Sequence, residues 1–375
     1  MYQTVYRKAV KPELIEACNK YPIGKTKIIE ANCFEYITTA QISELLSNFV
    51  RTRGLAPRTA NRYREILVRL GAISVPRRGP KTRVHEGIRT ENVAVLLMGM
   101  DTRLAHAPVM ATAIHGIGNE LTENKLNMTM AYVNRASQLP PAVLDGRVDG
   151  ILMEGVCPSA EILAKISDIP KVWFMTQNAN PNLEVDEVYS DEDRIGFLAA
   201  DYLAGLGFDN LVFLNSEPAH ISFSARRRAF VSYCMASNIK AELLEPENVV
   251  TSQIRSIDSN IQIVEQLVER FLELSPRPRG IFVPSDMQAA NLYQILNSRG
   301  IKPGKDVIVV SCNNETEVLA GLDPKPVSID IGAEIIGKKA VEQLMWRIKN
   351  PDEHRMKILV EPRLVQPVSK QSFMQ

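Results

Sequence analysis

The chain is poor in cysteine and aromatic residues, and no long apolar run occurs in it. Its five cysteines are scattered along 375 residues without a Cys-x-x-Cys pair or a short Cys/His cluster. Such irregular spacing argues against a disulfide framework or a zinc site and is typical of reduced thiols. The longest apolar runs, such as "VAVLLMGM" (93–100), are far too short to span a membrane. Because the N-terminal residues also lack the apolar stretch of a signal peptide, we expect a cytoplasmic protein with no membrane partner.

The usual sequence motifs of enzymes are missing as well. The chain contains no Gly-x-Gly-x-x-Gly, no Gly-x-x-x-x-Gly-Lys-Ser/Thr and no Gly-x-Ser-x-Gly. These motifs build dinucleotide sites, phosphate-binding loops and nucleophile turns respectively. Their absence predicts a protein that is not an enzyme, with no catalytic residue, no metal and no cofactor.

What the chain does have is one strongly basic segment, residues 51–84. It holds ten Arg and Lys residues against the single acid Glu65, which is about +9 in a chain whose formal net charge is +1. The rest of the chain therefore carries about −8. A positive charge gathered in one place predicts contact with a polyanion through that segment.

The basic segment has the pattern of a winged helix-turn-helix. Residues 38–54 ("TTAQISELLSNFVRTRG") predict one helix, and a second helix is expected to begin near Pro57, after a tight turn. The second helix has an apolar face and an opposite face of Arg and Asn, side chains that bind guanine and adenine edges. The following "GAISVPRRGPKTRVHE" reads as a hairpin with a cationic tip, as in a wing. An isolated surface arginine is usually just solvated, but ten cations on a predicted helix-turn-helix and hairpin favour DNA binding. RNA binding would call for exposed aromatics. The residues predicted to contact DNA are Arg58, Thr59, Asn61, Arg62, Arg64, Arg69, Arg77, Arg78 and Lys81.

After residue 90, short apolar runs alternate with amphipathic segments. "NVAVLLM", "VDGILME", "KVWFM", "NLVFLN", "GIFVP" and "DVIVVS" are bounded by turn residues and separated by stretches of helical period. This alternation is typical of parallel βαβ units and predicts an α/β fold. Two successive series of such units indicate two doubly wound halves, whose ligand sites lie beyond the carboxyl ends of the strands.

Six longer segments of this part of the chain are "VDGILMEG" (148–155), "YSDEDRIGFLAADYLAGLGFDNLVFLN" (189–215), "SARRRAF" (224–230), "GIFVPSDMQAANLYQILNSRGIKPGKDVIVVSCNN" (280–314), "PKPVSIDIGAEIIGKKAVEQL" (324–344) and "ILVEPRLV" (358–365). In their order and spacing the chain resembles the lactose/galactose repressor (LacI/GalR) family over roughly residues 91–370. The resemblance implies a type I periplasmic-binding-protein-like core of two doubly wound subdomains, crossed by the chain three times.

The basic segment and the resemblance together predict a domain plan. A winged helix-turn-helix domain over residues 1–86 and a linker over 87–92 precede an effector domain over 93–370. Within it, we expect an N-subdomain of about 93–177 and 315–329 and a C-subdomain of about 178–314 and 330–370.

The family's effector residues carry over one position at a time. Arg226 in "SARRRAF" matches an effector-binding arginine, and Ser222 matches a hydroxyl of the same loop. Asp286 in "VPSDMQAA" matches an acid that accepts hydrogen bonds from effector groups. His106 and Met110 stand in a stretch where the family usually has aromatics that stack on a sugar ring. Plainer alternatives remain open for three of these residues: Asp286 could simply cap its helix, Arg226 could pair with an internal acid, and His106 could be an ordinary surface or core histidine.

The N-terminal segment departs from the family. The Thr-x-x-Asp-Val-Ala headpiece is absent, and the basic unit in its place resembles the winged readers of GntR- and DeoR-type regulators. The expected function is that of a ligand-responsive DNA-binding transcriptional regulator that acts as a repressor. Its expected partners are operator DNA, a small effector such as a sugar, and a second copy of the chain. The alternatives are a solute-binding protein of a transport system and an enzyme on the same fold.

Overall fold

A computed structural model describes residues 87–100, 108–180, 183–247 and 257–367. The chain divides into two units between residues 82 and 83, and every described residue belongs to the second. The predicted winged helix-turn-helix domain of residues 1–86, with its nine predicted DNA contacts, lies outside the described residues. The described unit contains two six-stranded sheets with helices on both faces, which confirms the predicted α/β fold.

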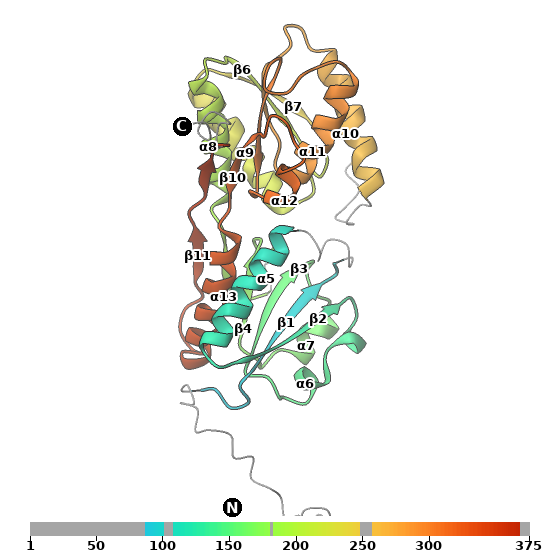
Figure 1. Ribbon diagram of the computed structural model, residues 1–375. Helices are drawn as coiled ribbons and strands as arrows, with labels where there is room; N and C mark the ends of the chain where they lie inside the picture. Colours follow the sequence, from blue (N-terminus) through green and yellow to red (C-terminus); the bar gives the residue numbers. More distant parts are fainter. Residues whose placement is uncertain (1–86, 101–107, 181–182, 248–256, 368–375) are drawn as a thin grey trace, which may run out of the picture. The chain divides into compact units, whose positions relative to one another are not determined.

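The first sheet, sheet A, has the strand order β11-β5-β4-β3-β1-β2, and all of its strands run parallel. Val93, Val95 and Leu97 of β1 face the helices α5 and α13, whereas Ala94, Leu96 and Met98 belong to the core on the other face. Figure 1 shows α5 and α13 side by side along this sheet. Its elements are β1 (Asn92–Met98), α5 (Pro108–Glu123), β2 (Asn127–Val133), η2 (Ala136–Gln138), α6 (Pro141–Leu144), β3 (Gly150–Gly155), α7 (Ala160–Lys165), β4 (Lys171–Met175), β5 (Asp186–Ser190), α13 (Ala333–Lys349) and β11 (Lys357–Val360).

The second sheet, sheet B, has the order β12-β10-β9-β8-β6-β7, and only β12 runs antiparallel to its neighbour. Leu211 and Phe213 of β6 pack with residues of α8 and α9, whereas Val212 and Leu214 pack with α10 and α11. Buried on both faces, these strands are apolar throughout, as central parallel strands usually are. The elements are α8 (Glu192–Gly205), β6 (Asn210–Leu214), α9 (Ile221–Ala236), β7 (Lys240–Leu244), α10 (Ile257–Leu272), β8 (Gly280–Phe282), α11 (Asp286–Ser298), β9 (Ile308–Cys312), α12 (Thr316–Leu319), β10 (Val327–Asp330) and β12 (Arg363–Val365).

Local side chains and glycines define the ends of α8 and α11. Asp191 caps α8, since its carboxylate accepts a hydrogen bond from the Arg194 amide at 2.9 Å. Gly207 and Gly300 follow α8 and α11 with φ of 83° and 77°, the left-handed backbone that favours glycine after a helix.

The two sheets divide the chain differently from the expected subdomain plan. The strand β10, within the segment expected in the N-subdomain (315–329), pairs in parallel with β9 of sheet B. The segment 330–370, expected in the C-subdomain, begins with α13, which packs on sheet A, and continues through β11, which pairs with β5. The strand β5 itself lies in sheet A, beyond the expected boundary at 177. The chain therefore passes between the sheets after β5, after β10 and after β11. Strand pairing, which depends on distant residues, decides these boundaries.

A pair of glycines lets α5 and α13 approach closely. A Cβ atom on Gly116 would meet the backbone oxygen of Glu334, and one on Gly337 would meet that of Ala113. The two helices thus pack backbone against backbone on sheet A. The helix α13 begins just after β10, and its last turn lies beside Gly87, the first described residue.

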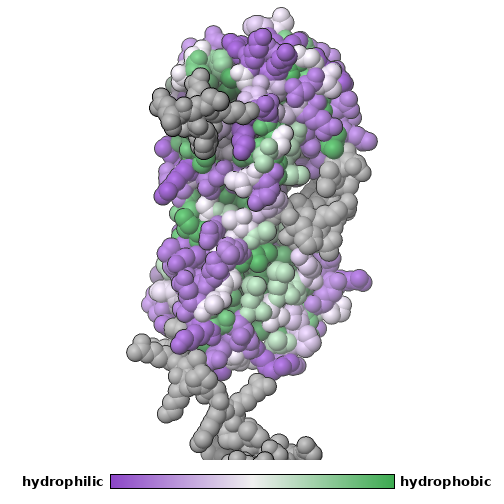
Figure 2. Space-filling view, in the orientation of Figure 1, coloured by the Kyte–Doolittle hydropathy of each residue, from purple (hydrophilic) through white to green (hydrophobic). Residues whose placement is uncertain are grey.

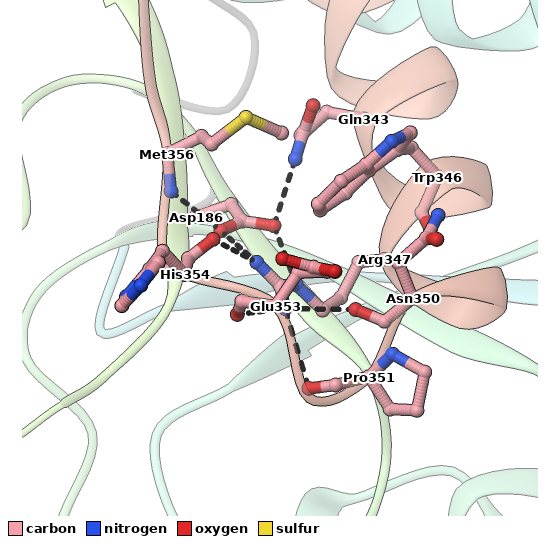
Figure 3. Close-up of polar contacts among 9 residues, drawn as sticks. All are labelled: Asp186, Gln343, Trp346, Arg347, Asn350, Pro351, Glu353, His354 and Met356. Carbon is pink, nitrogen blue, oxygen red and sulfur yellow. Dashed lines mark hydrogen bonds and ion pairs between the residues drawn. The ribbon is translucent and has the colours of Figure 1, made fainter.

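A buried arginine holds the segment that leads into β11. Arg347 and Asp186, both almost fully buried, form a two-pronged ion pair with both N–O distances at 2.8 Å. The same guanidinium donates to the backbone carbonyls of Asn350, Pro351, Glu353 and His354 (Figure 3). Gln343 and the Met356 amide complete the contacts of the Asp186 carboxylate. Arg347 therefore folds the chain after α13 back onto sheet A, where β11 can pair with β5.

The segment expected to be a linker, residues 87–92, is anchored on the body of the unit. Ile88 is 4% exposed and belongs to the main core. The Asp149 carboxylate accepts hydrogen bonds from the amides of Arg89 and Thr90 at 2.8 and 2.9 Å, and from the Thr90 hydroxyl. A Cβ atom on Gly87 would lie 2.8 Å from a methyl group of Ile348 near the end of α13. Residues 87–92 are thus part of the folded unit.

The surface is mixed, with one apolar region on the visible face. Figure 2 shows green residues gathered over the β1 and β2 side of sheet A, among mostly purple neighbours. On the edge strand β2, Met128 and Met130 are 40% and 44% exposed. Among the described residues, no helix is both long enough and apolar enough to cross a membrane.

Candidate functional site

Asp286 lies at the centre of a buried polar cluster at the carboxyl ends of the sheet B strands. Its side chain is fully buried and accepts hydrogen bonds from the hydroxyls of Ser311 at 2.5 Å and Ser328 at 2.8 Å. The Glu315 amide donates to the other carboxylate oxygen at 2.7 Å. Ser285, one residue earlier, caps α11. Asp286 therefore joins β9, β10 and α11, and it is not the capping residue of its own helix.

Arg226 lies in the same cluster and pairs with an acid of the protein. It is 2% exposed, and its Nε donates to the Glu192 carboxylate at 2.5 Å. Its Nη1 donates to the Pro284 carbonyl at 2.6 Å and reaches the Asn313 side-chain oxygen at 3.4 Å. Two elements of the same face, α8 and α9, thus supply the pair, and the arginine points to the loops that follow β8 and β9.

Glu315 connects this cluster to the other half of the unit. One carboxylate oxygen accepts a hydrogen bond from the Val109 amide, in the first turn of α5, at 3.1 Å. The helix N-terminus favours a carboxylate at that position. The second oxygen, Oε2, is buried and has no hydrogen-bond partner among the described residues. Glu315 therefore carries one satisfied and one unsatisfied oxygen at the point where the two halves meet.

An imidazole and an aromatic ring flank the arginine. The ring of His220 stacks on Phe223 with 4.1 Å between centroids, and the Arg226 guanidinium lies 5.5 Å from the centre of the Phe223 ring. Burial lowers the pKa of His220 to about 4, and the Arg226 charge adds to this effect. His220 is therefore neutral near pH 7, and its Nδ1 atom lacks a hydrogen-bond partner among the described residues.

The carboxyl end of sheet A also holds a buried acid. Glu154, at the end of β3, accepts hydrogen bonds from the hydroxyl of Thr176 at 3.0 and 3.1 Å. Burial raises the pKa of Glu154 to about 8, although the Thr176 hydroxyl and amide offset part of that rise. Nearby Met175 and, in sheet B, Asn313 have φ of 69° and 107°, which are strained values for residues with side chains. Strained backbone is concentrated at ligand sites, so both strand ends are suited to binding.

Two of the cluster's own carboxyls have raised pKa values. Burial raises the pKa of Asp286 to about 6 despite the two serine hydroxyls. Burial also raises the pKa of Glu315 to about 7; the Val109 amide works against this shift and the Asp286 charge adds to it. The folded protein thus holds protons that an unfolded chain would release at the same pH.

We expect the free energy of unfolding to fall as the pH rises from 6.5 to 8.5. A carboxyl whose pKa is raised in the folded state stabilises the fold at low pH, and this stability is lost as the pH rises through the folded-state pKa. The loss amounts to at most about 1.4 kcal/mol per pH unit for each group. His220, with its lowered pKa, opposes this only below about pH 6.5. Urea unfolding monitored by tryptophan fluorescence measures the slope, and Trp173 donates to Thr176 beside Glu154.

Glu154→Gln should remove a large share of that slope, because Glu154 has the highest of the three values. Glu161→Gln, on an exposed position of α7, is the matched control and should leave the slope unchanged. Equal slopes in both variants would contradict the assignment of the bound proton to Glu154.

The structure brings together part of the predicted effector set. Arg226 and Asp286 lie in one cluster, and Ser222 is buried at 3% exposure in the same helix as Arg226. Met110 is a core residue of α5 at 5% exposure. His106 lies outside the described residues. Within the described ranges, no group of three or more His, Cys, Asp or Glu residues could hold a metal ion.

Sequence reasoning missed Glu192 and Glu315. Glu192 stands at the first position of α8, where an acid is usually explained by the helix dipole alone. Glu315 follows β9 by three residues, so its place after the strand "IVVSC" was the one available signal.

Comparison with known proteins gives the relatives of this fold. A family model described as "Periplasmic binding protein-like domain" matches residues 200–369. The HTH-type transcriptional repressor PurR of Vibrio atlanticus is 26% identical over 225 residues, covering 59% of this chain and 64% of that repressor, slightly under two thirds of its length. The ribose operon repressor of Haemophilus influenzae is 23% identical over 278 residues, covering 72% of this chain and 79% of the repressor.

Solved structures of regulators have the same fold. The transcriptional regulator CelR in complex with cellobiose has a TM-score of 0.63 at 19% identity and covers 88% of this chain and 98% of its own. A LacI family regulator from Enterococcus faecium with bound ribose has a TM-score of 0.59 at 20% identity and covers 73% and 97%. Sheet topology and the family model agree on a periplasmic-binding-protein-like fold, and the curated relatives that this chain resembles are transcriptional repressors.

Proposed function

We propose that the chain is a ligand-responsive DNA-binding transcriptional regulator, a repressor like its relatives. Its described unit senses a small molecule, a sugar or related metabolite, at the carboxyl ends of its strands. The observation that carries the proposal is the buried cluster of Arg226, Asp286 and Glu315, which joins loops of sheet B to α5 on sheet A. Paired charged and polar groups of this kind orient polyhydroxylated ligands.

The DNA contact is assigned to residues 1–86, as a winged helix-turn-helix domain. Support comes from the charge of about +9 over residues 51–84 and from the names of the relatives, which are repressors. A homodimer on two half-sites is the matching assembly. The exposed Met128 and Met130 on the edge strand β2 suit an interface between copies. The cytoplasm is the proposed compartment.

Anchoring of residues 87–92 supports a route for coupling. Asp149 and Ile88 hold this segment on the effector unit, next to the end of α13. A shift of α13 on effector binding would therefore move the start of the chain leading to residues 1–86. Coupling between two sites typically amounts to about 1–3 kcal/mol, or roughly 5- to 150-fold in operator affinity.

Fluorescence anisotropy with labelled DNA from the protein's own promoter tests the proposal. Contact with about 5–8 phosphates across a dimer should give a slope of log affinity against log salt of roughly −5 to −7. A scrambled DNA of equal length and base composition is the control and should bind more weakly. A flat salt response, or equal affinity for both DNAs, would contradict the proposal.

A further inference from the structure

The carboxylate of Glu315 has two oxygens with different surroundings. Oε1 accepts from the Val109 amide at 3.1 Å, while the buried Oε2 meets no donor at hydrogen-bonding distance and angle among the described residues. The nearby Asn313 side chain offsets part of the burial effect on the pKa of Glu315 without completing a hydrogen bond to Oε2. Glu315 is only 4% exposed. A buried carboxylate oxygen without a donor is costly, because it has lost its hydration without replacement. The position is therefore one at which an incoming hydrogen-bond donor is strongly favoured.

The ionisable groups around Glu315 are mainly acidic. Among the described buried groups of the cluster, the carboxyls of Glu192, Asp286 and Glu315 face one guanidinium, that of Arg226. Arg226 is already engaged by Glu192 at 2.5 Å and by the Pro284 carbonyl. Glu317, two residues on, adds another acid on the exposed side, and His220 is neutral near pH 7. A ligand anion placed here would be repelled, whereas an amine or hydroxyl would be attracted.

We propose that Glu315 is a specificity-determining residue of the effector site, whose Oε2 accepts a hydrogen bond from an amino or hydroxyl group of the effector while Oε1 holds the first turn of α5. This inference rests on the proposed function and names the chemical class of effector. The class is a neutral or cationic molecule rich in donors, such as an amino sugar or an aminated nucleoside. Sugar phosphates and sugar acids are disfavoured if their anionic group faces Glu315.

The same contact connects binding to the arrangement of the two halves. The Glu315 amide donates to Asp286 in sheet B, and its side chain accepts from α5 on sheet A. A donor arriving at Oε2 therefore binds where the two halves already touch. Its binding would act on α5 directly. Because α5 and α13 pack closely at Gly116 and Gly337, it would also act on α13, whose Ile348 lies beside Gly87.

Thermal-shift measurements on the full chain with matched probes test the class. D-glucosamine, D-glucose and D-glucuronate share one ring and differ in charge, and adenosine and inosine differ by an amino group in place of a carbonyl. We expect the larger rise in Tm with glucosamine than with glucuronate, or with adenosine than with inosine. The proposal is overturned if glucuronate raises Tm more than glucosamine does and inosine more than adenosine does. It is also overturned if neither of the two amino-bearing probes, glucosamine and adenosine, raises Tm.

Variants of Glu315 test the residue, with Kd measured calorimetrically for the donor-bearing probe that raises Tm. Glu315→Gln keeps an oxygen for the Val109 amide and replaces the second oxygen by an NH2 group. We expect it to weaken binding about 10- to 100-fold, the usual range for a lost hydrogen bond to a charged group. Glu161→Gln, at an exposed position of α7 outside the cluster, should leave Kd unchanged. An unchanged Kd in Glu315→Gln, whatever its Tm, would mean a structural role only and overturns the proposal.

Operator binding without effector, measured in parallel, separates this inference from the proposed function. Sequence-specific DNA binding that persists while the probes fail leaves the regulator proposal standing and removes only the effector class. If the unmodified chain shows no sequence-specific DNA binding, the regulator proposal is overturned, whatever the thermal-shift probes show.

Discussion

Arg347→Met is expected to lower the free energy of unfolding of the described unit by about 3–5 kcal/mol, the usual cost of removing one partner of a buried ion pair. The substitution leaves the Asp186 carboxylate buried at 0% exposure with only Gln343 and the Met356 amide as donors. It also removes the donor for four backbone carbonyls between residues 350 and 354. The arginine side chain normally lowers the pKa of Asp186 against the effect of burial, so the variant loses that charge stabilisation. Chemical denaturation at pH 7 gives the value.

Arg299→Met is the matched control for that measurement. Arg299 also forms ion pairs with two carboxylates, those of Glu269 at 2.5 Å and Glu265 at 3.0 Å, but all three side chains are solvent-exposed. Exposed pairs of this kind contribute about 0–1 kcal/mol. The double variant Asp186→Leu/Arg347→Met should recover only part of the loss, because the carbonyls of residues 350–354 still lack their donor. A loss in Arg347→Met no larger than that in Arg299→Met would contradict the role given to Arg347.

The double variant Arg58→Ala/Arg62→Ala is expected to weaken operator binding by about 2–6 kcal/mol, at least a roughly 30-fold loss of affinity. Each arginine is predicted to lie on the outward face of the second helix of the winged domain. A two-pronged arginine contact with a guanine contributes about 1–3 kcal/mol of discrimination. Because these contacts read bases, the loss should be larger for the operator than for scrambled DNA. Anisotropy titrations at one fixed salt concentration measure both.

The hairpin tip should respond differently. Arg77→Ala and Arg78→Ala remove predicted phosphate contacts, so they should weaken binding to all DNA sequences similarly. Each should also reduce the salt slope by roughly 0.9 per contact. Arg228→Ala, at an exposed arginine of α9, controls for the simple loss of a positive charge. Base reading by the second helix would be contradicted if Arg58→Ala/Arg62→Ala weakened binding to the operator and to scrambled DNA equally.

Periodicity predicted most of the strands but missed β5. The residues "DEVYS" of β5 are buried throughout, yet they begin with two acids and carry no apolar run. Asp186 is tolerated there only because Arg347, 161 residues later, neutralises it. A strand whose burial depends on a distant ion pair has no local signal, and the subdomain boundary at 177 that the resemblance implied also left it out.

The candidate site was predictable in part. The resemblance pointed to Arg226 and Asp286, and both lie in the buried cluster. One open alternative for Arg226, an internal acid partner, is present as Glu192. The alternative for Asp286, capping its own helix, is not what the geometry shows, since Ser285 holds that role. Glu315 had no motif to mark it, although it has the unsatisfied oxygen on which the effector class depends.

The α/β class and the concentration of positive charge in residues 51–84 follow from the sequence alone. These features depend on neighbours within one or two turns, which the sequence displays directly. The tertiary structure alone decided which sheet each strand joins and which carboxylates are buried together. Those outcomes depend on contacts such as that of Val109 with Glu315, separated by 206 residues, and burial and strand pairing arise only once the chain is folded.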